Sequence, residues 1–459
     1  MRKFHSVRAA AAVCSAIALA AASWPAGATA ETLQDAWSKA YASNPTIAAE
    51  RAALRTTDEG VPQARSGWRP TVSINGQTGI QYVDQESAFG NDTDTLFPSS
   101  ITGQVSQPIY RGGRTEADVA RAEAEVLAGR ANLMNVEQQV MLAVGQAYMD
   151  VLRDQAVVGL NENNVRVLER QLQATQDRFS VGEVTRTDVA QAESRVARAQ
   201  ADLKSAEGNL ETSRAAYARQ VGEPPGMLEP PANLAGAPEN LEAATDLAAR
   251  ANPVVLQAIG LHDSARNTVD LIRGELYPTV SLNGQVQQSY DTSRTIDETF
   301  SAQATVDLTV PLYQSGSVYS RVRAAKQLES QRLQQIESAR RQAIEQATQA
   351  WEQLVANRAR IDSLESEIRA NEIALEGVQQ EALVGTRTVL DILDAEQELL
   401  DSRVNLVRAR RDEYVAVFNL IAAVGGLTAG GLALDVPTYD PTGYYNRVRD
   451  QWFGTEPKN

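Results

Sequence analysis

The sequence RTEADVARAEAEVLAG, which starts at Arg114, opens a stretch of 67 residues without proline that ends in QLQATQDRFS at Ser180. Near the end of the stretch, seam positions recur at steps of three and four residues, which is the spacing of a coiled coil: Val165, Leu168, Leu172, Thr175 and Phe179. A helix of this length is about 100 Å long, several times the width of a compact domain. The stretch therefore predicts an elongated helical protein.

A second stretch of the same kind runs from Ser317 to Leu383, and it too has 67 residues and no proline. Its seam positions each lie 203 residues after those of the first stretch: Ile368, Asn371, Leu375, Val378 and Ala382. The match extends beyond the helices, because PTVSINGQ from Pro70 recurs as PTVSLNGQ from Pro278. Since there are two copies rather than many, the sequence predicts a duplicated fold and not a solenoid.

Each repeat is expected to contain a leading helix, two strands joined by a loop, the long helix, a turn and a shorter ascending helix. The first repeat covers 31–222, with strands about 70–84 and 100–110, the long helix 114–180 and the ascending helix 187–220. The second covers 239–425, with strands about 278–290 and 299–311, the long helix 317–383 and the ascending helix 390–423. We expect the leading helices over 32–66 and 240–274, so that two half-length helices flank each long one. The proline-rich stretch 223–238 is predicted to be a stiff connector, and 426–459 a strap on the outside.

The predicted strands alternate between apolar and polar residues. Val72, Ile74, Ile80 and Tyr82 lie on one face of the first strand, and Ser73, Asn75, Gln77 and Gln81 on the other. Alternation over about ten residues is typical of outer-membrane strands, which turn an apolar face to lipid and a polar face to a lumen. A half-buried strand in a water-soluble domain has the same pattern, so both interpretations stay open. The polar stretches Gln85–Ser99 and Asp291–Glu298 are predicted to be exposed hairpin loops.

The first 30 residues have the features of a secretory signal peptide. Arg2, Lys3 and Arg8 precede an alanine-rich apolar core, and Ala28-Thr29-Ala30 offers a cleavage site before Glu31; an uncleaved membrane anchor is the alternative. Removal of the three basic residues changes the formal net charge from -15 to -18. An acidic exported chain without a basic cluster is a poor nucleic-acid binder. Because no later stretch has the ~18 consecutive apolar residues of a membrane helix, we expect a periplasmic protein, or one that enters the outer membrane as β-structure.

The residue inventory argues against an enzyme and predicts no cofactor and no metal site. After removal of 1–30, the chain has one histidine, His262, and no cysteine. Clusters of metal ligands and histidine-based catalytic triads are thereby excluded. Gly112-Gly113 before Arg114 lacks the lysine of a phosphate-binding loop, and we interpret it as a tight turn between strand and helix.

Four motifs together resemble the TolC family of outer-membrane efflux proteins. They are SQPIYRGGR from Ser106, the turns VGEVTRTDV from Val181 and VGTRTVLDILDAEQ from Val384, and the segment YDPTGYYNRVRDQWFG from Tyr439. The resemblance covers essentially the whole mature chain. It implies a mainly α fold with a membrane β-barrel: a trimer whose 12-stranded β-barrel continues into a 12-helix α-barrel tunnel. Four strands and four helical columns per chain agree with that count, and three copies leave a channel where two would give a filled barrel.

The resemblance also implies a function and partners. The chain would be the passive exit duct of a type I secretion system or a multidrug efflux pump, in the outer membrane with its tunnel in the periplasm. As a homotrimer in contact with outer-membrane lipid, it would bind a periplasmic adaptor and, through it, an inner-membrane ABC or RND transporter. A periplasmic coiled-coil adaptor is the main alternative, and a simple porin is another.

The turns between long and ascending helices contain the predicted functional residues. Asp391 and Asp394 stand one helical turn apart at the start of the last ascending helix, where acids also favour the helix dipole. The resemblance implies that they project into the tunnel entrance as gate and selectivity residues, six carboxylates in a trimer. It further implies polar links that hold the tips closed, from Arg387, Asp188 and Thr187. Because the turns would be the exposed ends of the helical tunnel, we also expect them to contact the adaptor through Val181, Gly182, Val384 and Gly385.

Overall fold

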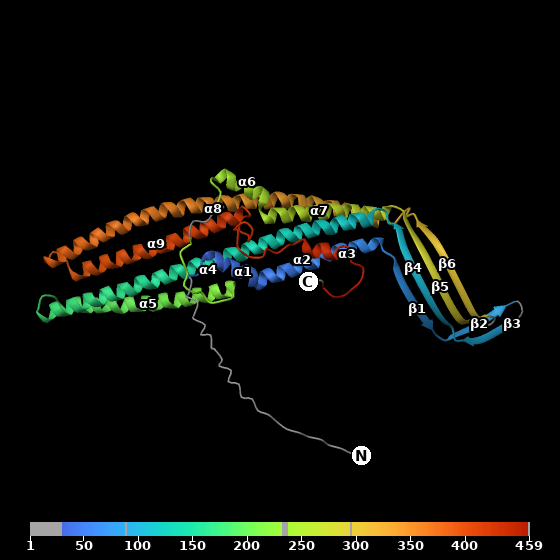
Figure 1. Cartoon of the computed structure of the whole chain (residues 1–459), viewed down its shortest axis with the longest axis horizontal. Helices are drawn as coiled ribbons and strands as arrows, with labels where there is room; N and C mark the ends of the chain where they lie inside the picture. Colours follow the sequence, from blue (N-terminus) through green and yellow to red (C-terminus); the bar gives the residue numbers. More distant parts are fainter. Residues whose placement is uncertain (1–29, 88–89, 232–236, 294–295, 458–459) are drawn as a thin grey trace, which may run out of the picture.

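The computed structural model describes residues 30–87, 90–231, 237–293 and 296–457. The predicted signal peptide lies outside these residues except for Ala30. The molecule is elongated, with long helices side by side over most of its length and strands gathered at one end (Figure 1). Among the described residues, no helix combines the length and apolar content that crossing a membrane would require.

The two long helices have the predicted length. The first half of the chain contains α1 (Leu33–Ser43), α2 (Pro45–Asp58), α3 (Gly60–Arg65), the short η1 (Ser66–Trp68), α4 (Arg114–Ser180) and α5 (Arg186–Val221). The second half contains α6 (Leu241–Ala251), α7 (Pro253–Arg273), η2 (Gly274–Leu276), α8 (Ser317–Leu383), α9 (Val389–Ala423) and α10 (Gly443–Val448). Both α4 and α8 comprise 67 residues, the same ranges that the sequence predicts.

The leading helices are not continuous, which corrects the expectation for 32–66 and 240–274. Each breaks at an asparagine that precedes a proline, Asn44 and Asn252, where the backbone is extended with ψ of 123° and 127°. Proline has no N–H to donate and disfavours helical geometry in the residue before it. Each asparagine then caps the next helix, because its side chain accepts a hydrogen bond from the backbone N–H two residues later.

The strands form one main sheet and one separate hairpin. The main sheet is antiparallel in the order β1 (Thr71–Thr78), β4 (Ser99–Tyr110), β5 (Thr279–Ser293) and β6 (Ile296–Thr309), and β2 (Gln81–Ser87) pairs with β3 (Gly90–Leu96). In Figure 1 the hairpin lies at the far end of the sheet, away from the helices. The main sheet, as described, keeps two free edges, β1 and β6.

Four of the bounds that the sequence predicts for strands and loops in this region are wrong. The strand expected over 70–84 stops at Thr78, and the expected loop Gln85–Ser99 is largely β2 and β3. The counterpart Asp291–Glu298 is likewise mostly strand, since β5 continues to Ser293 and β6 begins at Ile296. Backbone groups in a polar segment still need hydrogen-bond partners, and antiparallel pairing supplies them whatever the side chains are. The strand expected to end at 311 stops at Thr309, because Pro311 has no N–H for the ladder.

The main core lies near the middle of the helical layer, where the half-length helices meet α4. Trp37 of α1, Tyr148 of α4, Tyr217 of α5 and Phe418 of α9 are completely buried there. The indole Nε1 of Trp37 donates to the carbonyl of Met141 at 2.8 Å, and its ring meets Phe418 edge to face at 5.6 Å. A second cluster joins α4, α5 and α9 close to the tips. The apolar contacts therefore tie the two repeats together at two heights.

The segment from 426 onwards, called the C-terminal strap, follows the helices of the first repeat. The Tyr444 hydroxyl donates to Glu59 at 2.6 Å, and the backbone N–H of Tyr439 donates to the Tyr41 hydroxyl at 2.9 Å. Arg69 donates to the carbonyl of Gln451 at 2.6 Å. These contacts run from α1 to the start of β1, so the strap covers one face of the helical layer.

Candidate functional site at the helical tips and on the sheet

The two tip turns, α4–α5 and α8–α9, have the same backbone structure. After α4, Gly182 has φ of +81°, its N–H donates to the carbonyl of Phe179, and Glu183 N–H donates to Arg178. Gly385 also has φ of +81° and the matching pair of bonds follows α8. This is a Schellman motif, which favours glycine at its left-handed position. Both turns lie at the end of the molecule opposite the sheet (Figure 1).

Asp188 and Asp391 have identical roles in the helices that follow. Each carboxylate accepts hydrogen bonds from the N–H and the hydroxyl of the capping threonine, Thr185 or Thr388, all at 2.8 Å. The threonine hydroxyl in turn accepts from the aspartate N–H, which completes a capping box. The bonds from Thr388 lower the pKa of Asp391, and Arg387 lowers it further. Thr187 lies exposed in the first turn of α5.

Each turn is also bridged by one ion pair, with the charges exchanged between repeats. Arg178 contacts Glu183 at 2.7 Å across the first turn, whereas Glu381 contacts Arg387 at 2.9 Å across the second. The Glu381 hydrogen bond raises the pKa of Arg387, whose other neighbour is Asp391 at 3.8 Å. Within the chain, Arg387 therefore pairs with the acids of its own turn, and it does not reach Asp188, which the sequence analysis grouped with it.

Asp394 forms an ion pair that the sequence analysis missed. Its carboxylate accepts a hydrogen bond from the guanidinium of Arg195 on α5, and this contact links the helix pair α4–α5 to the helix pair α8–α9. Beside this pair, Val389 and Leu393 of α9 pack against Val196 in the apolar cluster near the tips. Arg195 lies seven residues after Asp188 and so on nearly the same face of α5. That spacing could have drawn attention to it, but its partner comes from the other repeat.

The tips expose apolar side chains to solvent. Val181 and Val384 are 77% and 76% exposed, and Leu383 beside the second turn is 79% exposed. Gly182 and Gly385 have open space where a side chain would start. Exposed apolar groups at the end of a helical layer are a feature of protein-binding surfaces.

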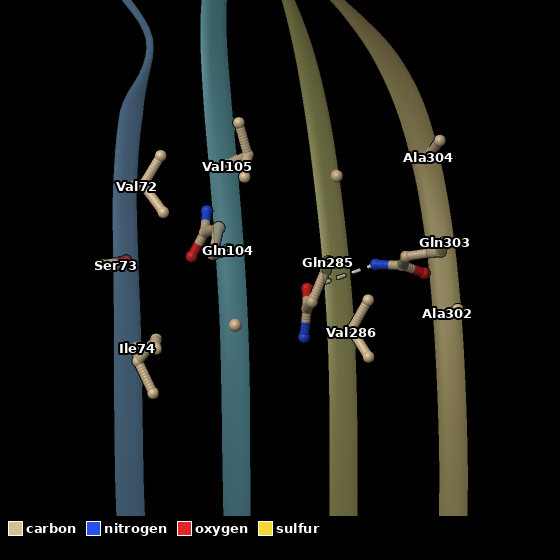
Figure 2. Close-up of a pocket in the computed structure, with 12 residues that line it drawn as sticks. Val72, Ser73, Ile74, Gln104, Val105, Gln285, Val286, Ala302, Gln303 and Ala304 are labelled. Carbon is tan, nitrogen blue, oxygen red and sulfur yellow. Dashed lines mark hydrogen bonds between the residues drawn. The ribbon is translucent and has the colours of Figure 1, made fainter.

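The register of the sheet sorts its residues into polar and apolar rows. Ser73, Gln104, Gln285 and Gln303 stand directly opposite one another across all four strands, and Figure 2 shows them at one level, with Gln303 donating to Gln285 at 3.3 Å. The next row on that face is Asn75, Thr102, Gln287 and Ser301. Neither row contains a charge.

The opposite face of the sheet decides between the two interpretations of the strand pattern. Val72 and Ile74 are 71% and 77% exposed, and Phe300 and Val306 are 68% and 70% exposed. A half-buried strand of a water-soluble domain would cover such side chains with other elements. An uncovered apolar face with a polar reverse side is the arrangement of a lipid-facing sheet.

The described residues contain no group of acidic, histidine or cysteine side chains that could hold a metal ion. His262, on α7, has Asp263 as its near neighbour, with 3.4 Å between Nδ1 and the carboxylate. In the described part of the chain, the notable features are the exposed tip turns and a sheet with one polar and one apolar face.

The sequence matches the family model described as outer membrane efflux protein over residues 36–223 and 244–426. It is 34% identical to the outer membrane efflux protein BepC of Brucella suis biovar 1, with 92% of each chain covered. It is 27% identical to the outer membrane protein TolC of Vibrio cholerae serotype O1, which covers 87% of this chain and 92% of that protein. The CmeC outer membrane channel of Campylobacter jejuni has the same fold, with a TM-score of 0.78 and 13% identity over 91% of this chain and 89% of that one.

These relatives confirm the predicted fold class, a helical tunnel joined to a β-barrel, and the predicted location in the outer membrane with the tunnel in the periplasm. They are channels rather than enzymes, and they do not favour the alternative of a periplasmic adaptor. The model match spans both repeats, and BepC exceeds 30% identity over nearly the full chain. This chain therefore belongs to the outer membrane efflux protein family.

Proposed function

We propose that three copies of this chain form the exit duct of a type I secretion system or a multidrug efflux pump. The observation that carries the proposal is that the two ends of one layer of long helices differ. One end has two matched tip turns, and the other has a four-stranded sheet with an uncovered apolar face and free edges at β1 and β6. Edge strands present unpaired N–H and C=O groups. Pairing β6 of one copy with β1 of the next would satisfy them and close a barrel of 12 strands.

The helices support the same stoichiometry. Near the tips each chain contributes α4, α5, α8 and α9, so three chains give a tunnel of 12 helices. In this proposal the repeats 31–222 and 239–425 each supply half of one protomer's wall. Residues 1–30 are removed on export, 223–238 connects the repeats, and the strap surrounds the tunnel from outside.

The tips are the proposed surface for a periplasmic adaptor, which in turn joins the duct to an inner-membrane ABC or RND transporter. Val181, Gly182, Val384 and Gly385 form the two exposed turns, and the valines offer apolar area at the end of the layer. The glycines allow close approach because no side chain covers the backbone there.

The gate is assigned to the acids that follow the second turn. Asp391 and Asp394 of three copies would place six carboxylates around one entrance and concentrate cations there. Arg387, Asp188 and Thr187 would form closing links between neighbouring copies, since Arg387 remains 49% exposed beside its own acids. The pair between Arg195 and Asp394 adds a link within each copy.

The proposal is tested by sedimentation and by single-channel recording. Detergent-extracted protein should sediment as a trimer, and Asp391→Asn combined with Asp394→Asn should weaken its preference for cations in a salt gradient. Arg387→Ser should raise the resting conductance and leave the preference for cations unchanged. Asp401→Asn, which removes an acid of α9 farther from the tip, is the matched control. A conducting monomer would refute the trimer, and an unchanged reversal potential in the double variant would refute the gate.

A further inference from the structure

A groove of about 620 Å³ lies between α4, α8 and the junction of α9 with α7. Nine of the fourteen side chains that line it are asparagine or glutamine, and none is charged. In a protein whose formal net charge is -15, such an uncharged polar surface requires an explanation. Its volume is in the range of ligand-binding pockets.

Two helix faces and one helix junction build the groove. Gln342, Gln346, Gln349 and Gln353 follow one another on α8 at steps of four, three and four residues, so they form a single stripe. Asn135, Gln138 and Gln139 face this stripe from α4. At the junction, Asn252 donates to the carbonyl of Ala423, the last residue of α9, and caps α7.

The floor of the groove contains a polar group without a partner. Gln138 is only 5% exposed, and its amide nitrogen Nε2 has no hydrogen-bond partner among the described residues. A buried amide that donates to nothing is costly. A ligand that accepts a hydrogen bond in the groove would remove this cost.

The groove opens on the face of the layer away from the strap. On α4, Glu137 accepts from the N–H of Ala429 in the strap, and Val144 packs in the core with α1. Asn135 and Gln139 point nearly the opposite way, because successive residues of a helix are separated by about 100°. If the strap surrounds the proposed tunnel from outside, the groove faces the path of the cargo.

We infer that this groove is a cargo subsite for extended, uncharged polypeptide; the inference rests on the proposed duct. An amide side chain has donors and an acceptor, which is the complement of a peptide group. Gln349 and Gln353 each donate one N–H to a neighbour on α8, Glu345 and Asn357, and keep the other. A charged ligand would lose hydration without gaining a counter-charge. From Gln342 to Gln353 the stripe is about 16 Å long, enough for about five extended residues.

The inference is tested by block of the open channel in planar bilayers. The probe is a ten-residue glycine-serine peptide, acetylated and amidated so that it has no charge. It is compared with polyethylene glycol of the same hydrodynamic size, which reports exclusion alone, and with maltopentaose, which offers hydroxyls without amides. We expect longer blocks from the peptide than from either comparison solute.

The test variant is Gln346→Leu combined with Gln349→Leu, which keeps side-chain size on an exposed helix face. Loss of two hydrogen bonds should shorten the peptide block about tenfold and leave the open-channel current unchanged. Gln327→Leu with Gln334→Leu, two exposed glutamines of α8 outside the groove, should leave the block unchanged.

The outcomes separate the subsite from the duct. Two outcomes would overturn the subsite and leave the duct intact, provided that the parent protein conducts. In the first, the peptide blocks the channel no longer than polyethylene glycol does. In the second, Gln346→Leu with Gln349→Leu does not change the duration of the peptide block. Equal dependence of the maltopentaose block on these glutamines overturns the assignment to polypeptide. A parent that forms no channel overturns the proposed function, and the subsite with it.

Discussion

Replacement of Asp58 by asparagine should stabilise the contact between α2 and the strap at neutral pH. Asp58 is completely buried at the end of α2, and neither carboxylate oxygen has a hydrogen-bond partner among the described residues. Burial raises its pKa from 3.8 to about 6, against the opposing effect of the Arg130 guanidinium. Tyr439 and Tyr444 of the strap lie within electrostatic reach of this carboxylate.

The magnitude follows from the difference between the two states. When the strap opens, Asp58 meets water and its pKa returns to about 3.8. With the strap closed, Asp58 binds its proton more tightly than with the strap open. Protonation therefore stabilises the closed strap fully below about pH 4, and this stabilisation is lost as the pH rises through about 6. The lost contribution is about 3 kcal/mol, equivalent to about a hundredfold change in the opening equilibrium.

The measurement is amide hydrogen exchange of strap peptides between pH 5 and 8, corrected for the intrinsic dependence of exchange on pH. The parent should lose protection as the pH rises to about 6. Asp58→Asn should lose far less and should be better protected by up to about a hundredfold above that pH. Asp440→Asn is the control, since hydrogen bonds from Thr442 lower the pKa of Asp440, and its removal should leave the slope unchanged. Equal slopes in the parent and Asp58→Asn would refute the reasoning.

Three further predictions concern the tips and the sheet. Gly385→Val should abolish export but not assembly, because a φ of +81° costs a β-branched residue about 1–2 kcal/mol. Gly385→Asn should keep substantial export, and equal export by the two variants would contradict the prediction. Arg195→Gln and Asp394→Asn should each raise the resting single-channel conductance, and the double variant should match either single one, since both remove the same pair; additive effects would argue against a shared role. Val306→Lys should destabilise the assembled protein by about 2–4 kcal/mol if residue 306 faces the middle of the bilayer, so that the assembly dissociates at a lower temperature. Gln303→Lys, on the polar face of the sheet, should assemble normally and reduce the preference of the channel for cations.

Much of the architecture could be predicted from the sequence because it depends on short-range periodicity. The absence of proline over 114–180 and 317–383 fixed the long helices, and a 203-residue offset fixed the duplication. The turn glycines and the threonine–aspartate caps were also readable, because both motifs are complete within about eight residues. The Asn-Pro pairs at Asn44 and Asn252 also signal the break of each leading helix, but the helix-forming residues on both sides led us to predict one continuous helix.

Contacts between the repeats could not be predicted in the same way. Nothing near Asp394 in the sequence indicates Arg195, which lies 199 residues earlier. The same is true of Asp58, because its isolation results from burial by α4 and the strap. The hairpin β2–β3 escaped prediction because its strands are stabilised by backbone pairing, and its polar side chains lack the apolar alternation that marks a strand.

The sequence by itself determined the class of protein: two repeats, long helices, amphipathic strands and the tip motifs are local patterns that survive without knowledge of the fold. Only the tertiary structure decided that the apolar face of the sheet is left uncovered, that the polar residues form uncharged rows, and that amide side chains of α4 and α8 meet across one groove. These features depend on strand register and on the rotation of each helix about its axis. Both are set by packing between segments that are distant in the sequence.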